Sequence, residues 1–172
     1  ALAEAKSNKF QNYSFYQNDS KREDAYKDNI FWAKKVKKAV DFKDIIPYFQ
    51  PIVNNKTLKV EKFEVLARMI DRDNNNEIIS PYIFLKHAQR IGLLRHISKI
   101  IIEKSFRYFS NKPFDFSINI TSEDFLDPTF SNYVTKQLKE YNIDAKRVIW
   151  EILENVSLSE DTIVLEQIKY LK

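Results

Sequence analysis

The sequence contains no cysteine and only one glycine, Gly92, among its 172 residues. Without cysteine, disulfides and thiolate metal sites are excluded, and the composition fits a reducing compartment. Phosphate-binding loops and dinucleotide fingerprints need several glycines, so both are excluded as well. No apolar run reaches the roughly 20 residues that a membrane-spanning helix needs, and no signal-peptide pattern opens the chain. We therefore expect a cytoplasmic location and no membrane contact from this chain, which leaves open a membrane anchor in other domains of a longer protein.

Charged residues are abundant but mixed in sign. The net charge is +4, from 28 Lys and Arg against 24 Asp and Glu. Because the two signs are interspersed along the chain, the pattern does not indicate a continuous basic surface. We expect no nucleic-acid polymer as a partner.

Hydrophobic patterning divides the chain into three regions, 1–17, 18–41 and 42–172. The first combines a helical stretch with a strand-like alternation, and the second repeats apolar positions at helical spacing, which indicates a helical linker. From residue 42 onward strands alternate with helices, a pattern typical of a parallel sheet with crossover helices. We expect strands at 46–53, 59–69, 114–121 and 148–153, the first two as a hairpin, and helices at 81–90, 95–109, 128–141 and 161–171.

The number of strand and helix units limits the architecture. A closed (β/α) barrel needs eight strands and about 250 residues, and the region after Asp41 supplies about half of that. The sequence therefore predicts an α/β fold, the N-terminal part of a TIM-like (β/α) barrel, incomplete, with an N-terminal helical linker. The chain begins with Ala1, so we interpret it as a piece of a longer protein. A half barrel exposes strand edges, and a homodimer through these edges is one way to cover them.

Polar residues share one face of the predicted strands. Successive side chains of a strand point to opposite faces, so Glu64 and Arg68 lie on the same side of the strand at 59–69. Asn119 lies on the polar side of the following strand, and Glu151 stands in the strand after that. Three strands that offer oxygen ligands to one centre suggest a metal site. By parity alone, the alternative for Glu64 and Arg68 is an exposed polar face.

The segment that follows the strand at 59–69 imitates the start of a calcium loop with Asp71, Asp73 and Asn75. However, Asn76 stands where the turn glycine is needed, and Tyr82 stands where the closing glutamate is needed. We therefore interpret the segment as a solvated loop.

Six short strings follow one another in the chain at plausible spacing. They are Tyr48-Phe49-Gln50-Pro51-Ile52-Val53, Phe63-Glu64-Val65-Leu66-Ala67-Arg68, Ser80-Pro81-Tyr82-Ile83-Phe84, Ile91-Gly92-Leu93-Leu94, Ser117-Ile118-Asn119-Ile120-Thr121 and Trp150-Glu151-Ile152-Leu153-Glu154. Together they resemble the N-terminal half of an EAL domain, the bacterial cyclic-di-GMP phosphodiesterase family, over 42–172. Residues 1–17 resemble the C-terminal end of a GGDEF domain, but they lack the glycine usual after its helix.

The resemblance implies roles for five residues. Glu64 matches the signature metal-binding glutamate, and Asn119 and Glu151 match two further ligands of Mg²⁺ or Mn²⁺. Arg68 matches the arginine that contacts a substrate phosphate. Gln50 matches the glutamine that lines the nucleotide pocket.

A sixth residue, Glu154, matches a glutamate that steadies a loop over the site, so the implied catalytic residues are Glu64, Glu151 and Glu154. Two positions depart from the family pattern, because Val65 replaces an alanine and Leu153 replaces a threonine. The paired aspartate, lysine and further glutamate of the family belong to later strands, beyond Lys172.

The resemblance implies a bacterial second-messenger signalling protein. Its complete EAL domain would hydrolyse cyclic-di-GMP to linear pGpG with a divalent metal ion, while this chain alone is expected to be inactive. The alternative is a non-catalytic cyclic-di-GMP receptor or a signalling and dimerisation scaffold. The departures at Val65 and Leu153 and the GGDEF-like remnant favour that alternative.

Overall fold

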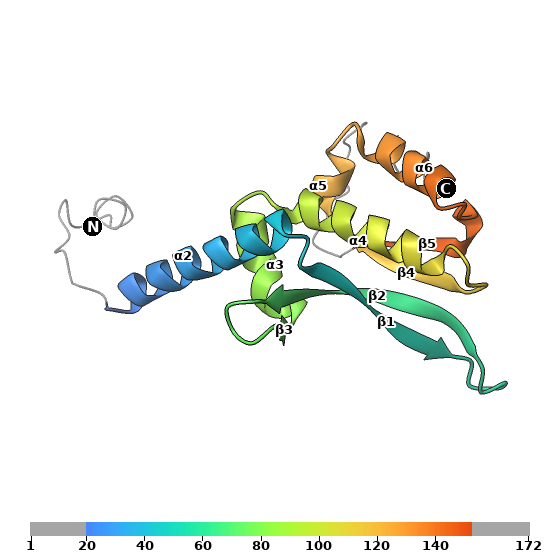
Figure 1. Cartoon of the computed structure of the whole chain (residues 1–172), viewed down its shortest axis with the longest axis horizontal. Coiled ribbons are helices and arrows are strands. Elements are labelled where there is room, and N and C mark those ends of the chain that lie inside the picture. Colours follow the sequence, from blue (N-terminus) through green and yellow to red (C-terminus); the bar gives the residue numbers. More distant parts are fainter. Residues whose placement is uncertain (1–19, 153–172) are drawn as a thin grey trace, which may run out of the picture. The chain divides into compact units, whose positions relative to one another are not determined.

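The computed structural model describes residues 20–152. The chain divides into two compact units, 1–31 and 32–172, and the boundary falls inside α2 (Ser20–Asp41). The second unit contains the sheet and every other described helix (Figure 1). The predicted helix at 161–171 and the GGDEF-like stretch 1–17 lie outside the described residues. The helix predicted in this region is present as α2, while its role as a linker stays a prediction.

In the described part of the chain, five strands form one mixed sheet. β1 (Ile45–Val53) pairs antiparallel with β2 (Val60–Asp71), which confirms the predicted hairpin. β4 (Asp115–Ile120) runs parallel to β2, and β5 (Val148–Ile152) runs parallel to β4. The order is β1-β2-β4-β5, and the short β3 (Glu77–Ile79) pairs with the C-terminal end of β2. The predicted α/β class is therefore confirmed.

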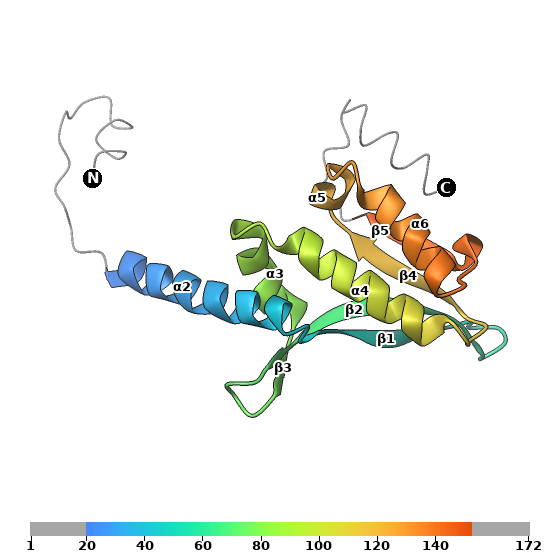
Figure 2. The same ribbon diagram turned by 45° about the horizontal axis from the view of Figure 1, so that its top comes forward.

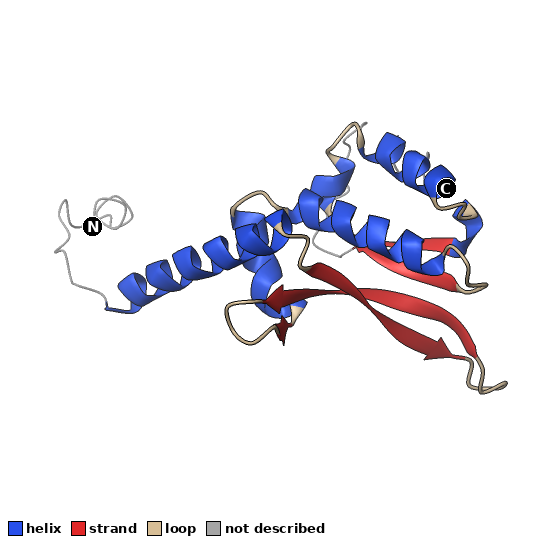
Figure 3. Ribbon diagram, viewed as in Figure 1, coloured by secondary structure: helices blue, strands red, loops and turns tan. Residues whose placement is uncertain are grey.

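Helices lie along one face of this sheet (Figures 2 and 3). The sheet forms one layer, and these helices form the other. α3 (Pro81–Arg90) ends just before Gly92, which adopts a left-handed conformation with φ of 66°. α4 (Leu94–Phe109) crosses the sheet, and α6 (Phe130–Glu140) lies beside it. Between β4 and α6 stands one further turn of helix, α5 (Ser122–Phe125). No described helix is both long and apolar enough to span a bilayer.

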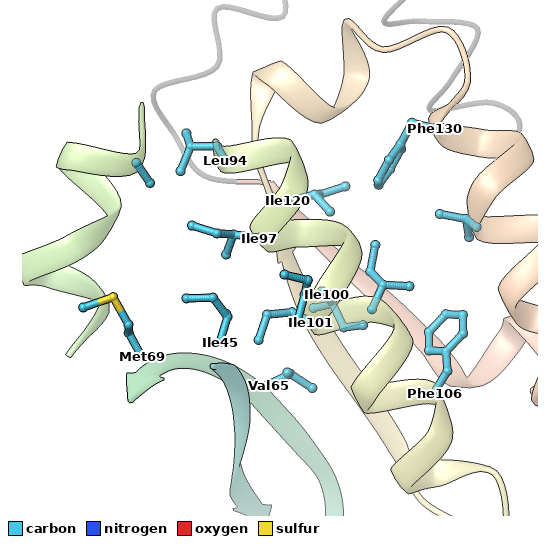
Figure 4. Close-up of a cluster of buried hydrophobic side chains, with 14 of the residues drawn as sticks. Ile45, Val65, Met69, Leu94, Ile97, Ile100, Ile101, Phe106, Ile120 and Phe130 are labelled. Atoms are coloured by element: carbon cyan, nitrogen blue, oxygen red, sulfur yellow. The ribbon is translucent and has the colours of Figure 1, made fainter. Parts of the chain in front are cut away.

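The hydrophobic core lies between the sheet and the helices (Figure 4). Phe49, Val65, Phe116 and Ile118 point to this side, which we call the outer face of the sheet. Phe116 is fully buried and stacks on Phe109 of α4, with ring centroids 4.3 Å apart. The opposite side, which carries Gln50, Glu64, Ser117 and Asn119, we call the inner face.

Arg147 fastens the start of β5 to the end of α4. It is the last residue of a 3₁₀ turn at Ala145–Arg147, directly before β5. Its Nε and Nη2 donate to the carbonyl oxygen of Phe114 at 3.2 and 2.6 Å. Nη2 also donates to the carbonyl oxygens of Phe109, at 3.4 Å, and Lys112. One side chain thereby ties the end of α4 to the loop that leads into β4 and to the turn that leads into β5.

The prediction of a solvated loop after β2 is wrong for its first residue, Asp71. Asp71 is the last residue of β2 and is buried, with 6% of its surface exposed. A buried carboxylate needs a partner, and Lys35 of α2 forms an ion pair with it. Asp73 is exposed and pairs with Lys38 at 2.5 Å. Both acidic residues are thus neutralised by lysines, which agrees with the rejection of a calcium loop.

Candidate active site

The inner face brings the predicted polar residues into adjacent positions on four strands. Gln50 is the register partner of Glu64, and Glu64 is the register partner of Ser117. One step further along, Asn119 is the partner of Glu151. Register partners point to the same side of a sheet. The fold therefore places four of the predicted site residues on one surface.

Glu64 and Asn119 are in direct contact. The Asn119 amide Nδ2 donates to the Glu64 carboxylate Oε1 at 3.3 Å, and both residues are half-buried. A carboxylate and an amide offer oxygen ligands, which suit a hard cation such as Mg²⁺ or Mn²⁺. A cation between them would need the amide oxygen of Asn119, in place of the nitrogen, to face Glu64. With that rotation the residues fit such an ion.

Glu151 supplies the second carboxylate of the predicted metal set. It is half-buried on β5 beside Asn119, while the neighbouring Trp150 points outward and packs against Phe130 of α6. Within residues 20–152, no three His, Cys, Asp or Glu side chains gather closely enough to hold a metal ion. A site here therefore depends on the amide of Asn119 as a ligand. Glu154 lies outside the described residues.

Arg68 lies at the C-terminal end of β2, next to Tyr48 of β1. Its guanidinium is 5.3 Å from the centre of the Tyr48 ring, and its Nη1 donates to the carbonyl oxygen of Ala67 at 2.9 Å. Neither of these partners carries a negative charge, so within residues 20–152 the cation remains available for an anion such as a phosphate. Tyr48 did not emerge from the sequence as a site residue. Its position, two residues before Gln50 on the same face, was the signal that could have identified it.

A cavity of about 300 Å³ lies beside the Glu64 and Asn119 pair. Strands β2 and β4 form one side of it, and the N-terminal parts of α3 and α4 form the other. Most of its lining is apolar, and the remaining lining residues carry carboxylate, amide and hydroxyl groups. The lining residues are Glu64, Val65, Leu66, Ala67, Pro81, Leu85, Leu94, Ile97, Ser98, Ile101, Asn119 and Thr121. A pocket with this mixture can hold a partly apolar ligand next to a polar reaction centre.

Behind the wall of this cavity lies the fully buried Asp124 of α5. Its Oδ2 accepts hydrogen bonds of 2.9 Å from the backbone nitrogen and the hydroxyl of Thr121, and from the hydroxyl of Ser98. Burial raises the pKa of the Asp124 carboxyl, because desolvation outweighs the hydrogen bonds from Thr121 and Ser98. The network fixes the end of β4, two residues beyond Asn119. The sequence alone does not reveal this network, because it depends on contacts between separate elements.

The sheet has parallel strands after an antiparallel first hairpin. Helices cover its outer face, and polar residues lie on its inner face. This arrangement is typical of the class of TIM-like α/β barrels. The family model of the EAL domain matches residues 33–172, so this chain belongs to the EAL-domain family. The predicted resemblance is thereby confirmed. The GGDEF-like stretch and the boundaries at 1–17, 18–41 and 42–172 stay predictions.

Individual relatives support the same family. The chain is 28% identical over 137 residues to a probable cyclic di-GMP phosphodiesterase, PdeI, of Escherichia coli, and 25% identical over 147 residues to the cyclic di-GMP phosphodiesterase PdeB of Shewanella oneidensis. These alignments cover 75% and 82% of the chain, respectively, but the chain spans only 17% of the length of either relative.

A solved structure shows the same fold. The EAL domain of FimX from Xanthomonas citri, in complex with cyclic-di-GMP, superposes with a TM-score of 0.72 at 16% identity. The match covers 87% of this chain and 59% of that one. At this identity the likeness shows the fold, and it agrees with the predicted incomplete TIM-like barrel.

Proposed function

We propose that the protein carrying this chain is a metal-dependent phosphodiesterase that hydrolyses cyclic-di-GMP to linear pGpG. The observation that carries the proposal is the contact between Glu64 and Asn119, from adjacent strands of a chain that belongs to the EAL family. The names of the relatives, and the ligand of the FimX structure, support cyclic-di-GMP as the substrate.

In this proposal Glu64, Asn119 and Glu151 hold Mg²⁺ or Mn²⁺ with two carboxylates and one amide. The ion, when bound, neutralises phosphoryl oxygens and activates a water molecule. Arg68 binds a phosphate oxygen, since its present partners leave the positive charge uncompensated. Gln50, exposed on β1 opposite Glu64, contacts the nucleotide.

The sixth residue, Glu154, steadies a loop over the site, as the family resemblance implies. The cysteine-free sequence fits a reducing compartment, so we place the enzyme in the cytoplasm.

Two departures from the family pattern, at Val65 and Leu153, favoured the receptor alternative, and the structure weakens the first. Val65 is only 2% exposed and packs in the core on the outer face, although it also lines part of the cavity beside Glu64 and Asn119. Replacement of an alanine there affects packing against α4, and the ligands on the inner face remain the same. The other departure, Leu153, lies outside the described residues.

Turnover by the full-length protein tests the proposal. We expect release of pGpG from cyclic-di-GMP with Mg²⁺ or Mn²⁺, no release with EDTA, and loss of activity in Glu64→Gln. Calorimetry with cyclic-di-GMP in parallel separates the alternatives. Tight binding by a folded protein without turnover in either metal would overturn the enzyme and establish the receptor.

A homodimer through the barrel edges is a separate proposal. β1 lies at one end of the strand order, so one of its edges has no partner strand among the described residues. Light scattering across a range of concentrations tests it. A monomer at all concentrations, with a cooperative melt, would exclude the dimer.

A further inference from the structure

Ser117 is buried on the inner face of β4 with an unused hydroxyl. None of its surface is exposed, and its Oγ has no hydrogen-bond partner among the described residues. Buried polar side chains are nearly always paired, so an unpaired hydroxyl needs a reason. One register partner of Ser117 is Ile149, which offers an apolar side chain, and the other is Glu64. The carboxylate of Glu64 is therefore the polar group that directly neighbours this hydroxyl across the strands.

Glu64 receives a hydrogen bond from Asn119 in this structure. An amide can direct either its NH₂ group or its oxygen at a neighbour, but not both. If Asn119 turns its oxygen to a metal ion, Nδ2 rotates away and Glu64 loses this donor. A metal-bound carboxylate usually keeps a further hydrogen bond that orients it. Gln50, on the other side of Glu64, is exposed to water, whereas Ser117 is shielded from it.

We propose that Ser117 is a positioning residue that replaces Asn119 as the donor to Glu64 when the metal ion binds. Its hydroxyl then donates to the Glu64 oxygen that does not face the ion. The carboxylate is held in the orientation that binding requires, and the hydroxyl gains the partner that it otherwise lacks. This inference rests on the proposed function, because it assigns Ser117 to the same metal site.

Ser105 of α4 provides a matched control. It is also fully buried, and its hydroxyl also lacks a hydrogen-bond partner among the described residues. Ser105→Ala therefore makes the same chemical change as Ser117→Ala, but in the helical layer and away from the inner face. A difference in Mn²⁺ affinity between the two variants would therefore be due to where the hydroxyl lies, since both hydroxyls are equally buried.

The experiment is a Mn²⁺ titration of the full-length protein by calorimetry, without substrate. Ser117→Ala is expected to weaken Mn²⁺ binding by about 10- to 100-fold, the usual effect of removing a group that orients a metal ligand. Ser117→Thr, which keeps the hydroxyl and suits a strand, is expected to restore most of the affinity. Ser105→Ala is expected to bind Mn²⁺ like the parent. In EDTA, Ser117→Ala should melt no lower than the parent, because it removes an unpaired buried group.

The outcomes separate this inference from the proposed function. If Glu64→Gln loses Mn²⁺ affinity while Ser117→Ala keeps it, the metal site stands and the role of Ser117 is overturned. An equal loss in Ser105→Ala and Ser117→Ala would also overturn it, since the effect would then come from packing. If the parent protein itself binds no Mn²⁺, the metal site and the role of Ser117 fall together.

Discussion

The two faces of the sheet use alternate residues of the same strands for different purposes. On the outer face of β4, Phe116, Ile118 and Ile120 are almost completely buried against helices. On the inner face, Ser117 and Asn119 stand beside carboxylates of the neighbouring strands. The comparison teaches that stability and the proposed chemistry are separated by a single position along a strand. Substitutions of adjacent residues should therefore have qualitatively different effects.

The largest effect is expected for Glu64→Gln, compared with Val65→Ala. Loss of a carboxylate ligand should reduce kcat/KM for cyclic-di-GMP roughly 10³-fold, equivalent to about 4 kcal/mol of transition-state stabilisation. Val65 is 2% exposed on the outer face, so Val65→Ala should lower the free energy of unfolding by about 2 kcal/mol. Steady-state kinetics and urea unfolding measure the two effects. Equal losses of activity in both folded variants would break the comparison.

Phe116→Ala tests the outer face alone. Phe116 is fully buried and stacks on Phe109, so its truncation should lower the free energy of unfolding by about 3 to 4 kcal/mol. Ile149→Ala, on the inner face where Ile149 is 36% exposed, should lower it by only about 1 kcal/mol. Urea unfolding measures both. If Ile149→Ala were as damaging as Phe116→Ala, the inner face would carry a core of its own.

The acid dependence of stability provides a smaller test in the helical layer. Hydrogen bonds from Thr129 and the Lys99 ammonium lower the pKa of Asp127 to about 2, from an ordinary value of 3.8. A lowered pKa stabilises the fold above the ordinary value, and this contribution disappears as pH falls towards 2. Asp127→Asn should therefore lower the free energy of unfolding by about 1 to 2 kcal/mol near pH 7.

The same difference between Asp127→Asn and the parent should shrink between pH 4 and pH 2. Urea unfolding at a series of pH values measures it, with Asp144→Asn in the loop before β5 as a control for a carboxylate outside this network. Since Asp127 and Lys99 lie in the helical layer, Mn²⁺ affinity at pH 7 should stay unchanged. A constant difference at all pH values would contradict the assignment to the ionised carboxylate.

The smallest effect is expected where each face has a cation beside a tyrosine. On the inner face Arg68 lies over Tyr48, so Tyr48→Leu should raise KM about two- to fivefold and leave kcat unchanged, since such contacts contribute roughly 0.5 to 1 kcal/mol. Beyond the outer face, Lys112 lies 3.8 Å from the ring of Tyr108, which stacks on Phe49. Tyr108→Leu should lower stability slightly and leave KM unchanged. A change in KM in both variants would contradict a separate role for Tyr48.

Periodicity predicted most of the described fold, because long elements contain several repeats of their pattern. The hairpin, the helices at 81–90 and 95–109 and the two parallel strands are present within one or two residues of their predicted ends. The helix predicted at 128–141 is shorter, at Phe130–Glu140, because Asp127 and Thr129 form a hydrogen-bonded turn before it. Trp150 packs outward against Phe130, as the alternation along β5 requires when its neighbour Glu151 faces inward.

The features that sequence could not predict are short or depend on three-dimensional contacts. β3 has three residues and α5 has four, too few for either to show a period. In β3, Glu77 is the register partner of Asp71 at the end of β2. From the sequence, the segment between these two residues is interpreted as one polar loop. In the site, parity predicted which residues share a face. The unpaired hydroxyl of Ser117 and the Asp124 network could not be predicted, because both depend on how separate elements pack.

Arg147 has a consequence for the proposed site at the opposite end of the strands. Its bonds to the carbonyl oxygen of Phe114 immediately precede the pairing of Val148 with Phe116. Counting onward from that starting point, the third step brings Glu151 level with Asn119. A slip of one residue would turn Trp150 inward and Glu151 into the core. The contacts of Arg147 therefore help to set the register between β4 and β5, and this register places Glu151, four residues after Arg147, beside Asn119.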